Sequence, residues 1–527
     1  MPNDRLNHRL AELASAQTLP EFTRIHRGLE KESLRVDGDG TLAQSPHPER
    51  LGSAFTHPLI TTDFSEALVE FITPVCTDVE DTLSALDQVH RYAYASLPEG
   101  ERLWTASMPC VLGEDSDIPV ARYGSTNAAR MKTVYRVGLG HRYGRKMQTI
   151  SGIHYNVSLP MTLWPVLAAQ DGSTLPLQDY ITERYFDLIR NFRRHSWLLV
   201  YLFGASPALC KSFLDDRPHQ LDEFDGHTLY LPYATALRMG NLGYQSSAQE
   251  DLPICYNSLK RYIDTLKDAI TRPHPAYEKL GLTRDGEYLQ LSTALLQIEN
   301  EFYSTIRPKR VTRSGEIPLG ALRERGVEYL EVRLLDVNPF LPLGMDAGQL
   351  RFIDAFLLYC LFSDSPRCDE RERKALGENL HKVVNRGREP GLNLDFNGSE
   401  RSLQDWGRSI LDGMRPIVEL LDQAHGNGLY RDTLEQAGAL LGNADLTPSA
   451  RVLRAMREHG LSWRDFALAQ SNIHAEYFRE RPLDADVNRA FQRQARESLR
   501  RQAALEAVDQ EDFETYLASY YRQYHQL

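Results

Sequence analysis

Two patterns of hydrophobic and polar positions divide this chain. Up to about residue 345, short runs in which apolar and polar residues alternate predict strands, and segments with helical spacing lie between them. Beyond that point apolar residues recur at helical spacing among abundant charge, as in AGQLRFIDAFLLYCLF and DADVNRAFQRQARESLRRQAALEAV. We therefore predict an α+β body over residues 1–345 and a mostly helical region over residues 346–527, packed on that body.

The first predicted strand carries two acidic residues on one face. The segment RIHRGLEKESLRVDGDGTL is typical of two strands joined by a tight DGDG turn. Because side chains alternate between the faces of a strand, Glu30 and Glu32 project together with Leu34 and Val36. A solvated strand end is the commoner explanation of a single such pair.

A second acidic segment, TTDFSEALVEFITPV, follows. Asp63, Glu66 and Glu70 have the spacing of one helix face, but LVEFITPV is rich in β-formers and ends at a proline. We therefore expect a turn or short helix around Asp63 and then a strand that carries Glu70. Apolar residues flank Glu70, and a buried carboxylate requires a partner or a metal.

Two further strands each have one polar face. In QTISGIHYNVSL, Gln148, His154 and Asn156 lie opposite an apolar face, although a hydrogen-bonded core histidine explains His154 alone equally well. In GVEYLEVRLLDVNPF, Glu331 and Arg333 share the face opposite the apolar one. Taken in isolation, that pair is most simply a surface salt bridge.

A fifth segment, LLQIENEFYSTIRPKRVTRSGE, combines acids with a basic cluster. As a strand it would place Gln297, Glu299, Glu301 and Tyr303 on one face. The cations that follow are Arg307, Lys309, Arg310 and Arg313. In a net-acidic protein they form a candidate anion site, because guanidinium groups offer paired donors to phosphate oxygens. A solvated loop is the alternative.

Composition narrows the class of partner. The chain has 527 residues with 60 Lys+Arg against 72 Asp+Glu, a net charge of −12, which disfavours nucleic acids and anionic membrane surfaces. The six cysteines lack CxxC or zinc spacing. The N-terminal segment has no apolar signal-peptide core, and no window of about 18 apolar residues occurs. We therefore expect a cytoplasmic protein that binds neither nucleic acid nor membrane.

The acidic strand faces and the basic cluster together predict a metal–nucleotide site. Oxygen-rich ligation with at most one imidazole favours Mg²⁺ or Mn²⁺ over zinc. The cations would bind the phosphates of a nucleoside triphosphate. The chain contains no GxxxxGK[ST], GxGxxG or GxSxG motif, so P-loop, Rossmann and serine-hydrolase sites are disfavoured.

Long motifs follow one another over roughly residues 20–345. They are GLEKESLRV, THPLITTDFSEALVEFITP, YGRKMQTISGIHYN, YLFGASPALC, YLPYATALRM, LQIENEFYSTIRPKRVTRSGE and GVEYLEVRLLDVNPF. In this order they resemble the proteobacterial type of glutamate–cysteine ligase. The resemblance implies a glutamine-synthetase-like fold, in which a curved, mainly antiparallel sheet forms a funnel. It also implies that ATP phosphorylates the γ-carboxylate of L-glutamate and that the amine of L-cysteine displaces phosphate, the first step of glutathione biosynthesis.

The resemblance also implies roles for individual residues. The expected metal ligands are Glu30, Glu32, Asp63, Glu70, His154 and Glu331. The expected substrate-binding residues are Tyr135, Gln148, Arg238, Tyr244 and Tyr303. Arg333, next to Glu331 on the same face, is similar to the family residue that contacts the transferred phosphoryl group, so both are expected to act in catalysis. Arg238 and Tyr303 would hold an amino-acid carboxylate, and ATP phosphates would bind Arg333 and the basic cluster.

Alternatives remain open at this point. The nearest is an ATP-dependent carboxylate–amine ligase of the same superfamily that uses a different amine. A non-catalytic nucleotide or metal sensor and a metal-dependent phosphohydrolase are the others. We expect a monomer whose partners are ATP, L-glutamate and L-cysteine, with Mg²⁺ or Mn²⁺ as cofactor and glutathione as a candidate feedback inhibitor.

Overall fold

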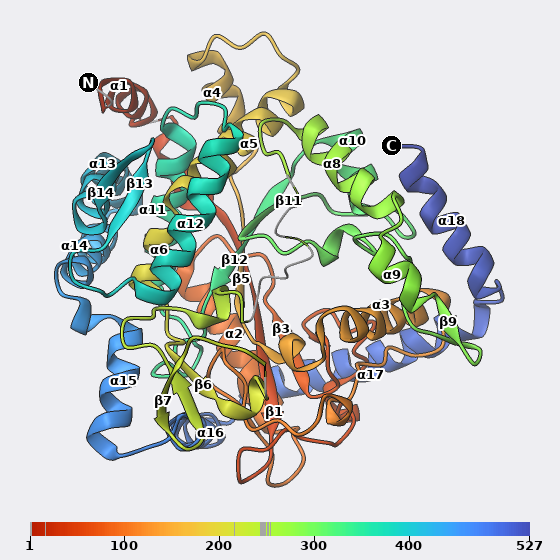
Figure 1. The fold of residues 1–527 in the computed structure, drawn as a ribbon. Coiled ribbons are helices and arrows are strands. Elements are labelled where there is room, and N and C mark those ends of the chain that lie inside the picture. The colour runs from red at the N-terminus through yellow and green to blue at the C-terminus, as the bar shows by residue number, and fades with distance from the viewer. Residues whose placement is uncertain (1–2, 16, 216, 243–248, 250–251, 253) are drawn as a thin grey trace.

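The computed structural model describes residues 3–15, 17–215, 217–242, 249, 252 and 254–527. A seven-stranded sheet runs through the centre, and helices lie on either side of it (Figure 1). Its strands are β1 (His26–Val36), β2 (Ile60–Thr62), β3 (Leu68–Ile72), β4 (Arg102–Leu103), β5 (Ile153–Ser158), β11 (Ile306–Lys309) and β12 (Tyr329–Leu335). Their order is β11-β12-β5-β1-β3-β2, with β4 paired to β1, and every pairing is antiparallel. The fold is therefore of the α+β class.

The register of the central strands aligns polar residues across the sheet. Glu30 on β1 lies opposite His154 on β5, and Glu32 lies opposite Glu70 on β3. Because side chains alternate along a strand, the intervening residues, such as Leu29, face the other way into the apolar core. The two faces of the sheet thus differ as the alternating pattern predicted.

Helices pack on the apolar face and around the rim of the sheet. Those before residue 346 are α1 (Asn3–Leu13), α2 (Val79–Tyr94), α3 (Asn127–Tyr143), α4 (Trp164–Gln170), α5 (Leu177–His195), α6 (Trp197–Phe203), α8 (Leu259–Thr271), α9 (Pro275–Leu280) and α10 (Pro318–Arg325). Those after it are α11 (Ala347–Phe362), α12 (Glu370–Arg386), α13 (Leu403–His425), α14 (Leu429–Gly442), α15 (Pro448–His459), α16 (Trp463–Arg479), α17 (Ala485–Val508) and α18 (Phe513–His525). Among the described residues, no helix combines the length and apolar character that crossing a bilayer requires.

Three small sheets complete the described structure. They are β6 (Ala208–Cys210) with β7 (Asp222–Asp225) and β8 (Thr228–Tyr230), β9 (Thr283–Arg284) with β10 (Glu287–Tyr288), and β13 (Asn393–Phe396) with β14 (Ser399–Ser402). The last pair is a hairpin inside the region predicted as helical. One apolar core joins the two parts of the chain, since it contains Leu330 of β12, Phe356 of α11 and Tyr524 of α18.

A buried ion pair fastens the sheet to the helices behind it. Arg27 Nη2 of β1 lies 2.7 Å from Asp354 Oδ2 of α11, and neither side chain is exposed. The hydroxyls of Tyr155 on β5 and Tyr430 on α14 also donate to Asp354. Breaking such a pair by removing one partner typically costs about 3–5 kcal/mol, so this contact fixes the strands that carry Glu30 and His154.

Three predicted strands differ from the structure. After the DGDG turn the chain makes only isolated bridges, in which Leu42 pairs with Val36 of β1 and Thr41 pairs with Val111. The strand predicted from Gln148 begins at Ile153, since residues 146–149 form a 3₁₀ turn in which the Thr149 hydroxyl donates to the Lys146 carbonyl. The strand predicted over residues 297–303 is a 3₁₀ helix, Glu299–Glu301, whose acidic side chains bind neighbouring donors.

Candidate functional site

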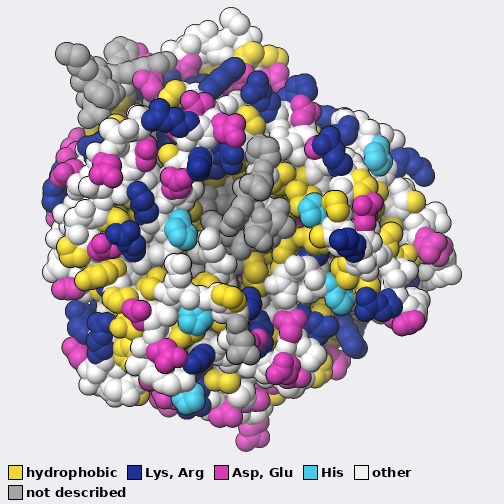
Figure 2. All heavy atoms as spheres, in the orientation of Figure 1, with side chains coloured by type: hydrophobic (Ala, Val, Ile, Leu, Met, Phe, Trp, Pro, Cys, Tyr) yellow, Lys and Arg dark blue, Asp and Glu magenta, His cyan; other side chains and the backbone are white. Residues whose placement is uncertain are grey.

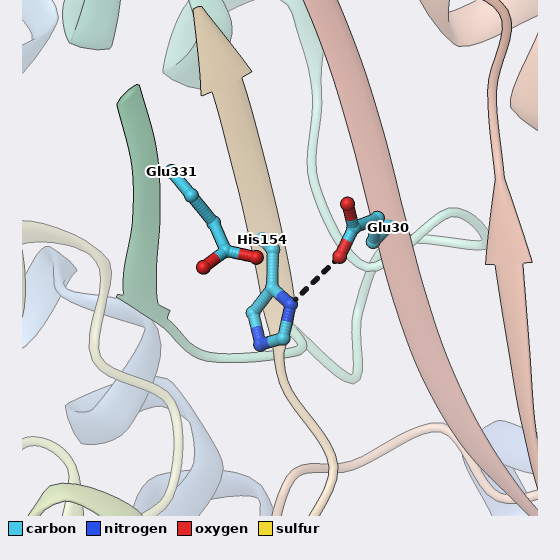
Figure 3. A group of neighbouring side chains, drawn as sticks. All are labelled: Glu30, His154 and Glu331. Atoms are coloured by element: carbon cyan, nitrogen blue, oxygen red, sulfur yellow. Dashed lines mark hydrogen bonds and ion pairs between the residues drawn. The ribbon is translucent and has the colours of Figure 1, made fainter. Parts of the chain in front are cut away.

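Three strands bring acidic and imidazole groups together on the polar face of the sheet. Glu30 of β1, His154 of β5 and Glu331 of β12 point toward one another (Figure 3). One ligand atom from each lies within 4.8 Å of the others, and His154 Nδ1 is 3.1 Å from Glu30 Oε2. Asn156, opposite Glu331 in the register, donates to Glu30 Oε1 at 2.8 Å and so orients that carboxylate.

The remaining predicted ligands extend this acidic row. Glu32 Oε1 lies 3.7 Å from His154 Nε2, and its Oε2 accepts a hydrogen bond from the Gly152 amide at 2.7 Å. Burial, followed by the charges of Glu30, Asp63 and Glu32, raises the pKa of Glu70 well above its usual range. Such repulsion among buried carboxylates is what a bound cation relieves.

Glu66, by contrast, is a structural residue. Its two carboxylate oxygens accept hydrogen bonds from the backbone amides of His47 and Arg122, each at 2.7 Å. The carboxylate therefore ties two loops together and lies outside the acidic row.

Cations surround Glu331. Arg333 Nη1 is 3.2 Å from Glu331 Oε2, Lys309 Nζ is 3.5 Å from Oε1 and Arg307 Nη1 is 4.0 Å from Oε2. Burial alone would raise the pKa of Glu331, but Lys309, Arg333, His154 and Arg307 outweigh it and hold that pKa well below the usual range. Glu331 is therefore ionised near neutral pH.

The donor set fits a divalent cation. It combines carboxylate oxygens with a single imidazole, the chemistry that Mg²⁺ and Mn²⁺ accept. Within the described part of the chain, the buried Oε2 atom of Glu331 accepts no hydrogen bond, so this oxygen still has a lone pair to offer a metal. The residues present thus match the cofactor expected from the sequence.

Three of the four cations of the basic cluster line a neighbouring pocket. This pocket has a volume of about 360 Å³. Its walls include Arg307, Lys309, Arg310, Tyr262, Leu319, Leu322 and Tyr329. Arg313 is not among the lining residues, and its backbone amide bonds the Glu316 carboxylate. The first part of the basic cluster thus faces the pocket, and the loop that follows leads away from the pocket.

A second pocket gathers most of the predicted substrate-binding residues. We call it the amine pocket, and its volume is about 100 Å³. Its walls include Tyr135, Gln148, Arg238, Tyr303, Arg333, Glu32, Asp63 and His154. Gln148 Nε2 donates to the Tyr303 hydroxyl at 2.9 Å. The remaining predicted residue, Tyr244, lies outside the described residues.

The guanidinium of Arg238, which lines the amine pocket, packs closely against the backbone at Gly152. It is 2% exposed, and its Nη2 donates to the Arg333 carbonyl at 3.0 Å. A β-carbon on Gly152 would lie 1.9 Å from Nη2, so only glycine leaves room for this guanidinium. Asp336, which the sequence did not single out, lies 3.9 Å from Arg238 Nη1 and is held by the Ser206 hydroxyl at 2.6 Å.

A buried polar network behind Tyr303 is also absent from the sequence-based prediction. Arg142 Nη1 of α3 lies 2.9 Å from Glu301 Oε1, which also accepts from the Tyr143 hydroxyl at 2.7 Å. Gln249 donates to that hydroxyl at 3.1 Å and accepts from the Tyr303 amide at 3.0 Å. The sequence indicated only that Glu301 and Tyr303 lie close together on one segment. The residues that complete the network lie far away in sequence.

The chain resembles known glutamate–cysteine ligases over nearly all of its length. Residues 10–383 match the family model described as glutamate-cysteine ligase. The glutamate–cysteine ligases of Pseudomonas paraeruginosa and Azotobacter vinelandii are 54% and 52% identical over 518 and 521 residues, which cover 98% of each chain. The crystal structure of glutamate–cysteine ligase from Francisella tularensis in complex with AMP superposes with a TM-score of 0.90 at 36% identity, covering 95% of this chain and 98% of that one.

A bifunctional glutathione synthetase from Pasteurella multocida is a more distant structural relative. It has a TM-score of 0.71 at 25% identity, and the match covers 90% of this chain and 55% of that one. The family model, the close relatives and the superposed structures agree. This chain belongs to the glutamate–cysteine ligase family.

Proposed function

We propose that the polar face of the sheet carries out ATP-dependent ligation of L-glutamate to L-cysteine. The γ-carboxylate of glutamate would be phosphorylated by ATP, and the cysteine amine would then displace phosphate to give γ-glutamylcysteine. The observation that carries the proposal is the position of Arg333. It touches Glu331 and His154 of the acidic group and also lines the amine pocket.

Arg333 is the proposed stabiliser of the transferred phosphoryl group. Its Nη1 lies 3.2 Å from Glu331 and 3.4 Å from His154 Nδ1, so the guanidinium is held in place before substrate binds. A preorganised cation of this kind stabilises the charge on a phosphoryl group in transit. Glu331 in turn fixes Arg333 and remains ionised.

We place Mg²⁺, with Mn²⁺ as an alternative, on the acidic row. The residues that would hold it are Glu30, Glu32, Asp63, Glu70, His154 and Glu331. When bound, the cation would neutralise charge on the ATP phosphates and on the transferring group. The carboxylates then no longer repel the anionic substrates.

The pocket beside β11 is the proposed nucleotide site. Arg307 and Lys309 lie toward Glu331, where the phosphates would meet the acidic row, and Arg310 follows the end of β11. Apolar and aromatic side chains, including Leu319 and Tyr329, line the same pocket and suit a base. The AMP bound to the Francisella tularensis relative supports a nucleotide site in this family.

The amine pocket would hold the amino-acid acceptor. Arg238 and Tyr303 are placed to bind a carboxylate, whereas Tyr135 and Gln148 would shape a space for a small side chain. Such a pocket favours cysteine over a bulky amine. Every residue of the proposed site belongs to one chain and lies within residues 1–345, so a monomer suffices. Residues 346–527 would pack around that body.

We also propose that the sheet is the curved funnel of glutamine-synthetase-like ligases. Its antiparallel order and its acidic polar face support this assignment. Phosphate release by the purified protein, measured with ATP, glutamate and one amine at a time, tests the proposed substrate. Cysteine and its analogue 2-aminobutyrate should be preferred, and a stronger preference for another amine would contradict the proposal. Comparable release without any amine would favour a phosphohydrolase instead.

A further inference from the structure

A third pocket, which the proposed reaction does not use, adjoins the amine pocket. Its volume is about 160 Å³, and we call it the arginine pocket. It lies between the junction of α5 and α6, helix α12 and residues 302–305. Its lining includes Arg193, Arg194, Arg373, Ser196, Trp197, Tyr256, Leu252, Ile254, Phe302, Leu376 and Leu380. Tyr303 lines both this pocket and the amine pocket.

The polar groups of the arginine pocket are predominantly hydrogen-bond donors. Trp197 is 2% exposed, and its Nε1–H is buried without an acceptor anywhere in the described chain. Arg193 stacks over the Tyr256 ring at 4.6 Å, and among the described residues it forms no ion pair. Arg373 lies 3.7 Å from Glu370, whose side chain is 89% exposed. A buried donor without an acceptor is costly, so these groups favour an anionic ligand that accepts hydrogen bonds.

The third guanidinium has a different role. Arg194 binds both carboxylate oxygens of Glu372, at 2.6 and 3.0 Å, and donates to the Pro366 carbonyl at 2.8 Å. Arg194 therefore links α5 to the start of α12. Among the described lining residues three are arginines and none is acidic.

The remaining lining residues favour a ligand that has an apolar portion. Leu252, Ile254, Phe302, Leu376 and Leu380 provide apolar surface opposite the donors. An inorganic anion would leave this surface without contacts, whereas a carboxylate with a short hydrocarbon chain would cover it. The lining thus combines a carboxylate anchor with an apolar wall.

We propose that the arginine pocket is an effector site for a small organic carboxylate. Tyr303, in the wall formed by residues 302–305, also lines the amine pocket, and the Thr305 carbonyl accepts a hydrogen bond from the Arg333 amide at 2.9 Å. A ligand held by Arg193 and Trp197 would therefore shift the affinity of the amine pocket. This second step rests on the proposed function; the binding step does not.

Thermal denaturation of the full chain with butyrate tests the binding step. Butyrate should raise the melting temperature, whereas its uncharged analogue butyramide and inorganic phosphate should have much smaller effects. Trp197→Phe keeps the ring and removes the N–H, and Arg193→Gln removes the charge; each should weaken butyrate binding by about tenfold or more. Arg408→Gln, at an exposed pair with Asp405, is the matched control and should bind normally. Equal butyrate binding in all four proteins would overturn the site.

Kinetics at saturating ATP and glutamate test the coupling. Butyrate should change the KM for cysteine by about fivefold in the wild type and leave it unchanged in Trp197→Phe. An unchanged KM while butyrate still binds would overturn the coupling. Absence of cysteine-dependent turnover in the wild type, with butyrate binding intact, would contradict the proposed function but not the site.

Discussion

Arg142 Nη1 of α3 lies 2.9 Å from Glu301 Oε1, and both side chains are fully buried. Glu301 is the last residue of the 3₁₀ helix that leads to Tyr303, and Gln249 connects its carbonyl to the Tyr303 amide. Taking two charges out of water is expensive, and this pair repays the cost only because it is fully hydrogen-bonded. The pair positions the Tyr303 side of the amine pocket.

Replacement of Glu301 by Gln should therefore affect the acceptor amine selectively. The change leaves Arg142 without its ion pair and loosens Tyr303, so the KM for cysteine should rise by about tenfold while the KM for ATP changes little. Steady-state kinetics with each substrate varied in turn provide the measurement. Glu101→Gln is the matched control, because it breaks another buried pair, Arg35–Glu101 at 2.7 Å, away from the pocket. Equal changes in every KM in both variants would show a merely structural role.

Arg333→Ala should abolish ligation without unfolding the protein. The variant loses the cation that touches both Glu331 and the amine pocket, and loss of such a group lowers kcat by about a thousandfold or more. Turnover with cysteine and circular dichroism, recorded on the same preparation, provide the test. Near-normal turnover would rule out the assigned role.

Glu331→Gln should weaken metal binding. The substitution keeps the size of the side chain but removes a charged oxygen donor, so Mn²⁺ affinity, followed by electron paramagnetic resonance, should fall by about tenfold or more. Glu328→Gln, at an exposed acid near Arg310, should leave Mn²⁺ affinity unchanged. A normal affinity in Glu331→Gln would place the metal elsewhere.

Lys31 gives a pH-dependent prediction for stability. Its side chain lies on the core face of β1, where Nζ is 2.8 Å from the Ser33 hydroxyl and 3.0 Å from His90 Nε2, and burial lowers its pKa to about 7. Between about pH 7 and pH 10 the unfolded chain thus holds a proton that the folded chain has lost, so this residue makes stability rise with pH.

Replacing Lys31 by Met removes that dependence. At pH 7 the variant should be more stable than the wild type by about 1–4 kcal/mol, because a buried cation is replaced by an apolar side chain. The advantage should shrink as the pH approaches 10. Denaturant titrations at both pH values provide the check, and an advantage that grows with pH would contradict the burial of an ionisable amine.

The sequence predicts which residues share a strand face better than it predicts which strands lie side by side. Glu331 and Arg333 share a strand, so alternation alone placed them together, and the same holds for Glu30 and Glu32. The register that sets Glu30 opposite His154 depends on pairing between distant segments. A local pattern contains no information about that pairing.

The strand predictions are wrong where local hydrogen bonds, and not the alternation of apolar and polar residues, determine the backbone conformation. Alternation predicts that Gln148 lies on a strand, yet it lies in a 3₁₀ turn, from which its side chain donates to the Tyr303 hydroxyl. The Arg142–Glu301 pair and the Asp336 support of Arg238 join residues far apart in the chain, so composition and spacing did not indicate them. Proximity in sequence groups Arg313 with the other three cations, although the strand ends at Lys309.

The face drawn in Figure 2 shows acidic and basic side chains interspersed over the surface. Of the acids that matter to the proposed reaction, Glu32 and Glu331 are instead buried on the polar face of the sheet, and Glu30, Asp63 and Glu70 are half-buried. The net charge of −12 is therefore a poor guide to what the site binds.

Oxygen transfer from glutamate to phosphate tests the central claim most directly. If glutamate attacks ATP through its γ-carboxylate and cysteine then displaces phosphate, one carboxylate oxygen must leave with the phosphate. With [γ-¹⁸O]glutamate, ATP, Mg²⁺ and cysteine, mass spectrometry should find ¹⁸O in the released phosphate in proportion to the γ-glutamylcysteine formed. Unlabelled phosphate accompanying product would contradict the acyl-phosphate route, and phosphate release without product would contradict ligation itself.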